Sequence, residues 1–170
     1  TTEEEVIQYW KGLGYYSRAI NLRKGAVFLK ENFQAKFPET LEETLLIPGV
    51  GPYTARAVLS IAYNKEYAVL DGNVKRVLAR YFLFKENISI PSSHKALQEL
   101  ADTFLNSKNP GDHNQAMMEL GATICLPAPL CMLCPIQKGC LAFEKGKQTE
   151  LPIMGKEKTK LPIQLKFFFL

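Results

Sequence analysis

All four cysteines of the chain lie in one short window, with the spacing C-x5-C-x2-C-x5-C at Cys125, Cys131, Cys134 and Cys140. Thiolates this close together in the sequence can surround a single metal centre without ligands from elsewhere. In a reducing compartment, clustered cysteines are more often metal ligands than disulfide partners. The pattern therefore predicts a metal site that holds either an iron–sulfur cluster or one zinc ion.

Asp71 is a lone carboxylate between an apolar run that ends at Leu70 and a predicted helix that begins at Asn73. In this position Asp71 or Asn73 can cap the helix by accepting a hydrogen bond from its first turn, which is the commoner use of such a residue. A carboxylate can also stabilise the positive charge that forms on a sugar carbon when a glycosidic bond breaks. That chemistry usually needs a second, protonated carboxyl group for the leaving group.

A glycine turn at Pro48, Gly49, Val50 and Gly51 joins two predicted helices. The N–H groups after such a turn point outward at the start of a helix, where they can bind a phosphate group. A phosphate contact of this kind would hold nucleic acid without reading its base sequence. The alternative is an ordinary corner between two helices, and the local spacing does not decide between them.

The elements that must position these residues are predicted to be almost entirely helical. The hydrophobic pattern places helices at residues 6–13, 17–32, 41–47, 52–63, 73–84, 92–105 and 112–124. Thr40 and Glu43 predict a capping box, and Pro52 suits the first position of a helix. Residues 145–162 are polar and lysine-rich, which is typical of a linker, and residues 164–170 could begin a strand.

The composition sets broad limits on the fold and the location of the protein. The 170 residues fit one domain or two small lobes, and 46% hydrophobic residues are enough for a packed interior. A net charge of +4 is compatible with a polyanion as a partner. No apolar run is long enough to span a bilayer, and the acidic N-terminus lacks the regions of a signal peptide. We expect an intracellular protein, in the cytoplasm and nucleoid or in a nucleus, without a membrane partner.

Taken in order, the glycine turn, Asp71 and the cysteine loop resemble the helix–hairpin–helix DNA glycosylases that carry an iron–sulfur cluster. The similarity is close to the adenine DNA glycosylases of the MutY type and covers residues 1 to about 145. It lies in residues 12–19, 48–51, 70–77 and 114–122, together with the cysteine loop. The resemblance implies an all-α fold. Residues 1–65 would form part of a six-helix barrel with the hairpin, residues 66–145 the cluster lobe, and residues 146–170 a linker and the start of a truncated C-terminal domain.

The resemblance also implies a reaction, which is removal of adenine mispaired with 8-oxoguanine in double-stranded DNA. The adenine would leave the helix and enter a pocket, as base-acting enzymes generally require. We expect a monomer. The implied catalytic residues are Asp71 and Asn73, and the implied DNA-binding residues are Leu13 and Tyr15 at the lesion, Gly49, Val50 and Gly51 at a phosphate, and Tyr53.

Tyr53 bears on the subclass of the enzyme. Relatives similar to endonuclease III carry a lysine at this position, whose amine forms a Schiff base that leads to strand cleavage. A phenol cannot form a Schiff base, so Tyr53 favours a monofunctional glycosylase. Two alternatives stay open, namely a bifunctional glycosylase/lyase of the endonuclease III type and a non-catalytic, zinc-stabilised DNA-binding module.

The cysteine spacing departs from that of the family by one residue. The family has C-x6-C-x2-C-x5-C, whereas the first gap here is Leu126–Leu130, which shortens the reach by about 3.5 Å. Two prolines also stiffen the gap. We expect a 4Fe–4S cluster, because the helix before Cys125 resembles that of the cluster-bearing relatives, and zinc is the alternative.

A second departure concerns the proton donor. The family's catalytic Glu lies a few dozen residues before the Gly12–Tyr15 motif, which would place it upstream of residue 1. Glu3, Glu4 and Glu5 lie in the wrong place and suit a solvated helix start. We therefore expect a fragment, truncated at both ends, that does not excise adenine by itself.

Overall fold

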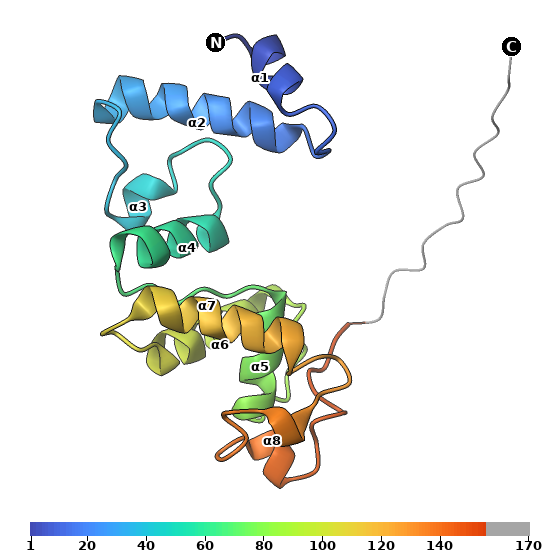
Figure 1. Cartoon of the computed structure of the whole chain (residues 1–170). Helices are drawn as coiled ribbons and strands as arrows, with labels where there is room; N and C mark the ends of the chain where they lie inside the picture. The colour runs from blue at the N-terminus through green and yellow to red at the C-terminus, as the bar shows by residue number, and fades with distance from the viewer. Residues whose placement is uncertain (156–170) are drawn as a thin grey trace, which may run out of the picture.

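The computed structural model describes residues 1–155, and every regular element in that part of the chain is helical (Figure 1). The elements are α1 (Glu3–Tyr9), α2 (Ser17–Phe33), α3 (Leu41–Thr44), α4 (Pro52–Tyr63), α5 (Gly72–Tyr81), α6 (Pro91–Phe104), α7 (Pro110–Thr123), the 3₁₀ helix η1 (Cys131–Leu133) and α8 (Leu141–Glu144). The predicted all-α fold is confirmed. The later part of the predicted linker and the predicted strand at residues 164–170 lie outside the described residues.

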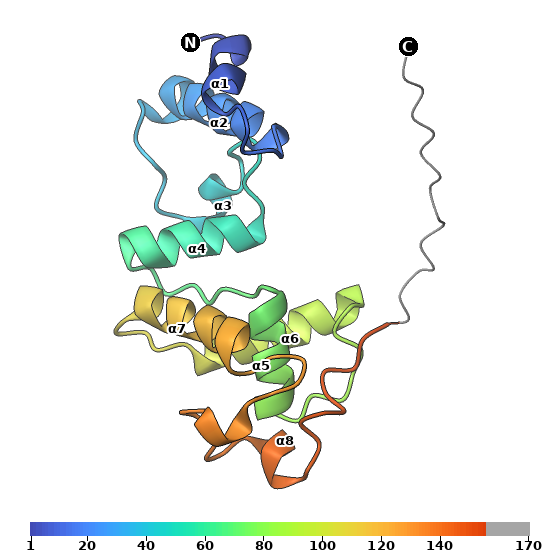
Figure 2. The ribbon, with the colours of Figure 1, turned by 45° about the vertical axis from the view of Figure 1, so that its right-hand side comes forward.

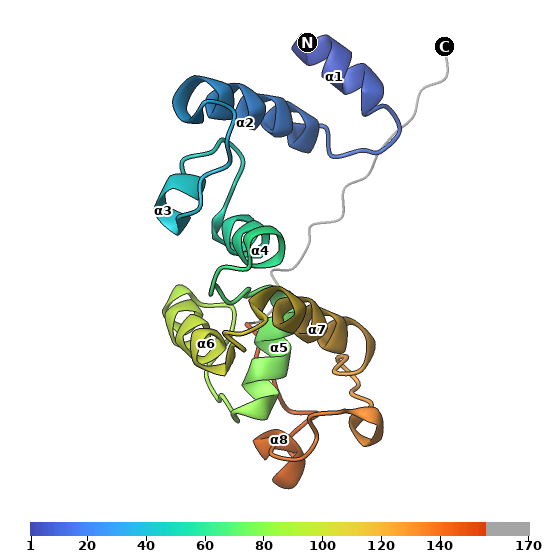
Figure 3. The same ribbon diagram turned by 60° about the vertical axis from the view of Figure 1, so that its left-hand side comes forward.

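Helix α7 joins the two halves of the structure. It packs against α4 on one side and against α5 on the other, and these two helix pairs make the most extensive contacts in the described chain. Helix α4 lies between α2 and α7 (Figure 3), and α5 and α8 lie on the far side of α7 from α4. Helix α6 lies beside α7, where its Asp102 pairs with Arg56 of α4 at 2.9 Å. None of the described helices is long and apolar enough to cross a membrane.

The largest core lies between α5, α6 and α7. Its buried residues are Ala68, Val74, Val77, Leu78, Ala79, Ile88, Leu97, Ala101, Met117 and Leu120. Burial of aliphatic side chains of this size stabilises the fold by roughly 1.5–3 kcal/mol each. The core therefore fixes α5, which begins directly after Asp71, against α7.

The buried side chain of Asn114 on α7 positions the segment that leads to Asp71. Its Nδ2 donates to the Ser60 hydroxyl and to the carbonyl oxygen of Tyr67, each at 2.8 Å. Its Oδ1 accepts a hydrogen bond from the N–H of Val69 at 2.9 Å. A buried amide with these partners is well satisfied, and it ties the extended segment before α5 to both α4 and α7.

Side-chain caps begin α1, α3 and α5, and several bounds differ from the predictions. Helix α1 lies earlier than the predicted residues 6–13, and α3 ends at Thr44 instead of residue 47. At α3, the Thr40 hydroxyl oxygen accepts a hydrogen bond from the N–H of Glu43. The Glu43 carboxylate accepts its hydrogen bond from the Thr40 hydroxyl and not from the Thr40 N–H, so the predicted capping box is incomplete. A complete box instead begins α1, between Thr2 and Glu5. Helix α5 ends at Tyr81, earlier than predicted, because Leu83 adopts a left-handed conformation with φ of 54°.

The first part of the predicted linker packs against the lobe of residues 66–145 that carries the cysteines. Leu151 is only 5% exposed, and its carbonyl oxygen accepts a hydrogen bond from Arg80 Nε at 2.8 Å. The N–H of Ile88 donates to the carbonyl oxygen of Ile153 at 2.9 Å. Residues near 151–153 are therefore part of the packed lobe, because both buried and hydrogen-bonded backbone hold them there.

Candidate functional site

Three candidate segments lie on the same side of the molecule. They are the loop before α2, the glycine turn before α4 and Asp71 at the start of α5 (Figures 1 and 2). Helix α7 connects the last two. The Tyr53 hydroxyl donates to Met118 Sδ at 3.7 Å, and Gly121, about one turn later, lies against Asn73. Tyr53, which follows the glycine turn, and Asn73, which follows Asp71, therefore contact neighbouring turns of α7.

Asp71 is the N-cap of α5, and its carboxylate is only half-buried. Oδ1 accepts a hydrogen bond from the N–H of Val74 at 2.7 Å, whereas Oδ2 accepts only a long contact of 3.4 Å from Asn73 Nδ2. Asp71 and Asn73 line an open pocket together with the chain near Leu151. The cap uses one carboxylate oxygen and leaves the other able to contact a ligand, so the two roles are compatible.

Arg76 links Asn73 to the first cysteine. Its Nη2 donates to Asn73 Oδ1 at 2.9 Å and to the carbonyl oxygen of Gly121 at 2.6 Å. Its Nε donates to the carbonyl oxygen of Cys125 at 2.7 Å. Hydrogen bonds from a guanidinium group are strong and directional. They hold the Asn73 amide in one orientation and couple its position to the cysteine loop.

A second cation, Lys75, lies on the same turn of α5. Its amine is 2.8 Å from His94 Nε2. Burial lowers the pKa of Lys75, and the negative charge of Asp71 partly opposes that shift. Two basic side chains, Lys75 and Arg76, therefore lie close to the Asp71 carboxylate.

Gly49 occupies a position in the turn where no other residue fits without rearrangement. Its φ is +81°, and a Cβ there would lie 2.5 Å from the Cβ of Asn21 on α2. Glycine alone adopts this conformation readily and permits this close approach. The turn is thus fixed against α2, the helix that also follows the exposed loop.

The start of α4 presents backbone donors beside this turn. Gly51 is its N-cap, and the helix has no side-chain cap. Within the described chain, the N–H groups of Gly51, Tyr53 and Thr54 have no backbone or side-chain acceptor, whereas the Val50 N–H donates to Ile47. Val50 was predicted to bind a phosphate together with Gly49 and Gly51, and its N–H is already used within the turn.

The loop before α2 exposes the two side chains expected to enter DNA. Leu13 is 64% and Tyr15 81% exposed. The loop turns sharply, with positive φ angles at Gly12, Gly14 and Tyr15. This exposure leaves both side chains free to contact a partner.

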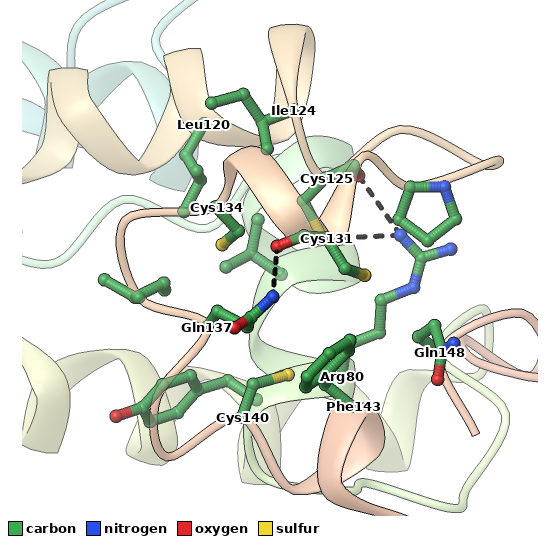
Figure 4. A pocket seen from close by; sticks show the side chains of 14 residues that line it. Arg80, Leu120, Ile124, Cys125, Cys131, Cys134, Gln137, Cys140, Phe143 and Gln148 are labelled. Carbon is green, nitrogen blue, oxygen red and sulfur yellow. Dashed lines mark hydrogen bonds between the residues drawn. The ribbon is translucent and has the colours of Figure 1, made fainter. Parts of the chain in front are cut away.

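The four cysteines line a single cavity, although the first gap is one residue short (Figure 4). The cavity extends from α5 and the end of α7 to α8, and its other walls are mainly apolar, formed by Val77, Leu120, Ile124, Ile136 and Phe143. Burial raises the pKa of both Cys131 and Cys134, and nearby cysteines add to that effect. A metal would have to displace the thiol protons, since the thiolate is the ligand.

Arg80 closes the short gap. This side chain is 3% exposed, and its Nη1 and Nη2 donate to the carbonyl oxygens of Leu126 at 2.6 Å and Pro127 at 2.9 Å. Nη1 also lies 3.3 Å from Cys125 Sγ. These hydrogen bonds hold the start of the loop between Cys125 and Cys131 over the guanidinium group.

The cavity places the four thiols beside a buried cation. Within residues 1–155 no carboxylate pairs with the buried Arg80 cation, so thiolates would supply its opposite charge. In the same part of the chain, no three His, Cys, Asp or Glu side chains are arranged to hold a metal ion. Four thiolates on one zinc ion would lie about 3.8 Å apart, closer than around a multi-iron cluster. Gln148 Oε1, at the cavity wall, is buried without a hydrogen-bond partner.

The predicted catalytic residues and the predicted metal ligands thus line two adjoining sites. Asp71 and Asn73 line one pocket, the four cysteines line another, and Arg76 and Arg80 connect them. The roles of these two arginines were not predicted. A usable signal existed, because Arg80 follows Arg76 by four residues and interrupts the apolar stripe of a buried helix.

Comparisons with known proteins identify the family of the chain. Residues 1–104 match the family described as "HhH-GPD superfamily base excision DNA repair protein". The chain is 36% identical over 168 residues to the adenine DNA glycosylase of Buchnera aphidicola subsp. Acyrthosiphon pisum, which covers 98% of this chain and 48% of that protein. It is 44% identical over 154 residues to the human adenine DNA glycosylase, covering 89% of this chain and 28% of that protein. The chain spans about half the length of the first of these relatives, and less of the second.

Two solved structures resemble the fold. One, described as a thermostable thymine-DNA glycosylase, has a TM-score of 0.75 and 34% identity, and the match covers 85% of this chain and 67% of that one. The other is a trapped endonuclease III–DNA covalent intermediate, with a TM-score of 0.68 and 23% identity over 86% of this chain and 68% of that one. At that identity, the second similarity concerns the fold alone.

Proposed function

The chain belongs to the HhH-GPD superfamily of base excision DNA repair proteins, and on this premise we propose that it acts in the removal of adenine paired with 8-oxoguanine. The observation that carries the proposal is that Tyr53, next to the glycine turn, and Asn73, next to Asp71, contact neighbouring turns of α7. The 36–44% identity to adenine DNA glycosylases supports adenine as the base. Double-stranded DNA with the A·8-oxoguanine mispair would be the substrate.

In the proposed reaction, the bond between the sugar C1′ and adenine N9 breaks, and its electron pair leaves with the adenine. The ionised Asp71 carboxylate stabilises the positive charge that develops on the sugar, through the oxygen that the helix cap leaves free. Water then adds to C1′ and loses a proton, which leaves an abasic site. Asn73, oriented by Arg76, lines the same pocket and would position the sugar or the water. The acid that protonates the departing adenine is not assigned to any residue of this chain.

DNA would be held by backbone donors and opened by the exposed loop. The free N–H groups at the start of α4 suit a phosphate, since the helix dipole favours negative charge there. Leu13 and Tyr15 suit insertion between bases, where an apolar or aromatic side chain replaces lost stacking. Together these contacts would keep the extrahelical adenine beside Asp71.

A monofunctional reaction follows from the residue at the start of α4. The Tyr53 phenol offers no amine for a Schiff base, and its hydroxyl contacts Met118. The DNA strand would therefore stay intact after base removal.

The function is tested by measuring affinity for duplexes that differ in one base pair. We expect this chain to bind a duplex with adenine opposite 8-oxoguanine about tenfold more tightly than the matched A·T duplex, because unpairing costs less at a mispair. Fluorescence anisotropy at fixed salt concentration measures the two affinities. Equal affinity for the two duplexes would contradict the proposal and favour a general DNA-binding module.

We propose that the four cysteines hold a 4Fe–4S cluster. A mainly apolar cavity lined by four thiols and, within the described residues, a buried arginine without a carboxylate partner support this assignment. Bound there, the cluster would cross-link the chain and add negative charge, because base removal needs no redox step. Arg80 and the cysteines would hold it.

Metal analysis separates the two cofactors. We expect the purified chain to be brown, with iron and sulfide in equal amounts and a broad visible absorption band. Removing the iron should lower the free energy of unfolding by several kcal/mol, because metal binding and folding are coupled. A colourless chain with one zinc ion would contradict the cluster and support the zinc-stabilised module.

A further inference from the structure

The guanidinium group of Arg18 lies between two aromatic rings of the exposed loop. Its Cζ is 5.7 Å from the centre of the Trp10 ring and 5.5 Å from that of the Tyr15 ring. We propose that Arg18 is a positioning residue, which holds the Tyr15 ring in the orientation that enters the duplex. This inference rests on the proposed function, since it assigns Tyr15 the role of inserting residue.

The conformation of Tyr15 needs stabilisation that the ring itself cannot supply. Its φ of 46° is in the left-handed region, which costs a residue other than glycine about 1–2 kcal/mol. Its side chain is 81% exposed, so core packing does not fix the ring. Without a restraint, such a side chain would sample several rotamers and lose that freedom only on binding DNA.

The contacts around Arg18 supply that restraint. The N–H of Arg18 donates to the carbonyl oxygen of Tyr15 at 2.9 Å, which fixes the backbone at the start of α2. The indole N–H of Trp10 donates to the carbonyl oxygen of Gly14 at 3.1 Å, which fixes the second ring. The planar guanidinium group is attracted to both rings and connects the fixed ring to the exposed one.

The expected effect follows from the strength of these contacts. At exposed positions, each such contact is weak, and two together correspond to about a fivefold change in affinity. Preorganising Tyr15 would increase DNA affinity, because less conformational entropy is lost on binding. Arg18→Met should therefore weaken binding of the A·8-oxoguanine duplex about fivefold, and Arg18→Lys should weaken it less.

The rival explanation is a direct contact between Arg18 and a DNA phosphate. That contact would be independent of Tyr15, and its loss would reduce the salt dependence of binding by about one unit. A positioning role requires Tyr15, so the effect of Arg18→Met should vanish when Tyr15 is already alanine. A double-mutant cycle measures this coupling directly.

The experiment uses the 170-residue chain, Arg18→Met, Arg18→Lys, Tyr15→Ala and the double variant of Arg18→Met with Tyr15→Ala. Lys24→Met is the matched control, since Lys24 is an exposed cation on the same helix. Anisotropy gives the affinity of each variant for the A·8-oxoguanine duplex.

Trp10 is the single tryptophan, so its emission reports on the Arg18 contact before DNA is added. We expect a changed Trp10 emission for Arg18→Met and Arg18→Lys, and none for Lys24→Met.

Each outcome decides one part of the inference. Equal losses for Arg18→Met with and without Tyr15, or Trp10 emission that is unchanged by Arg18→Met, would overturn the positioning role. A loss for Lys24→Met as large as that for Arg18→Met would overturn it too, because charge alone would then explain the effect. If Tyr15→Ala binds the duplex as tightly as the parent chain does, the insertion role in the proposed function fails. The Trp10 emission still tests whether Arg18 contacts the Trp10 ring.

Discussion

Replacing Asp71 with asparagine is expected to weaken binding of a duplex that carries a cationic abasic-sugar analogue by about 30-fold. A pyrrolidine ring with a protonated nitrogen mimics the positive sugar that forms as the base departs, and such analogues bind more tightly than substrates. The free oxygen of Asp71 would lie against that charge. Asparagine keeps the helix cap, because its side-chain oxygen can accept the Val74 N–H, so the fold should be unchanged.

The comparison that isolates the charge is a neutral analogue. A duplex with a tetrahydrofuran abasic site should bind the parent chain and Asp71→Asn about equally. Asp112→Asn is the matched control, because it removes the same charge from an exposed residue. Asp112 lies in the first turn of α7, at the end away from Asn73. Equal losses for the cationic and neutral duplexes, or for the two variants, would contradict a role for Asp71 in stabilising the sugar cation.

Arg80→Met is expected to abolish cluster binding and to lower the free energy of unfolding by about 3–5 kcal/mol. Methionine fills much of the space but leaves the carbonyl oxygens of Leu126, Pro127 and Leu151 without their donor. The short first gap would then open, and Cys125 would move away from the other cysteines. Iron content and thermal unfolding measure the two effects.

Two further variants test whether geometry or charge is responsible. Arg80→Lys keeps the charge but cannot reach three carbonyl oxygens at once, so it should lose most of the iron as well. Arg23→Met removes a cation from exposed helix α2, where Arg23 donates one hydrogen bond to Thr1, and should retain the iron. Full iron content in Arg80→Met would contradict the account of the short gap.

The helices could be predicted from the sequence wherever local signals determine them. The apolar spacing and Pro52 gave the start of α4, and Asp71 gave that of α5, because a proline or a cap acts within one turn. The end of α5 could not be predicted from the pattern, since apolar residues continue to Phe84 while Leu83 turns away. That turn depends on packing against the rest of the lobe.

The residues of the candidate site, too, could be predicted only where local signals determine their position. The cysteines are close in the sequence, so their shared cavity could be expected from spacing alone. Arg76 and Arg80 act on backbone carbonyl oxygens more than 40 residues away, and nothing local indicates such acceptors. The packing of Leu151 was missed for a similar reason, because the polar residues around it are typical of a linker.

The central claim is that a flipped nucleotide lies beside Asp71 while the glycine turn holds a phosphate. The most direct test is a crystal structure of this chain bound to a duplex with the cationic pyrrolidine analogue. The account predicts the ring nitrogen in contact with the free Asp71 oxygen and a phosphate at the N–H groups of Gly51 and Tyr53. DNA bound on a surface that excludes Asp71, or a sugar ring turned away from it, would contradict the claim.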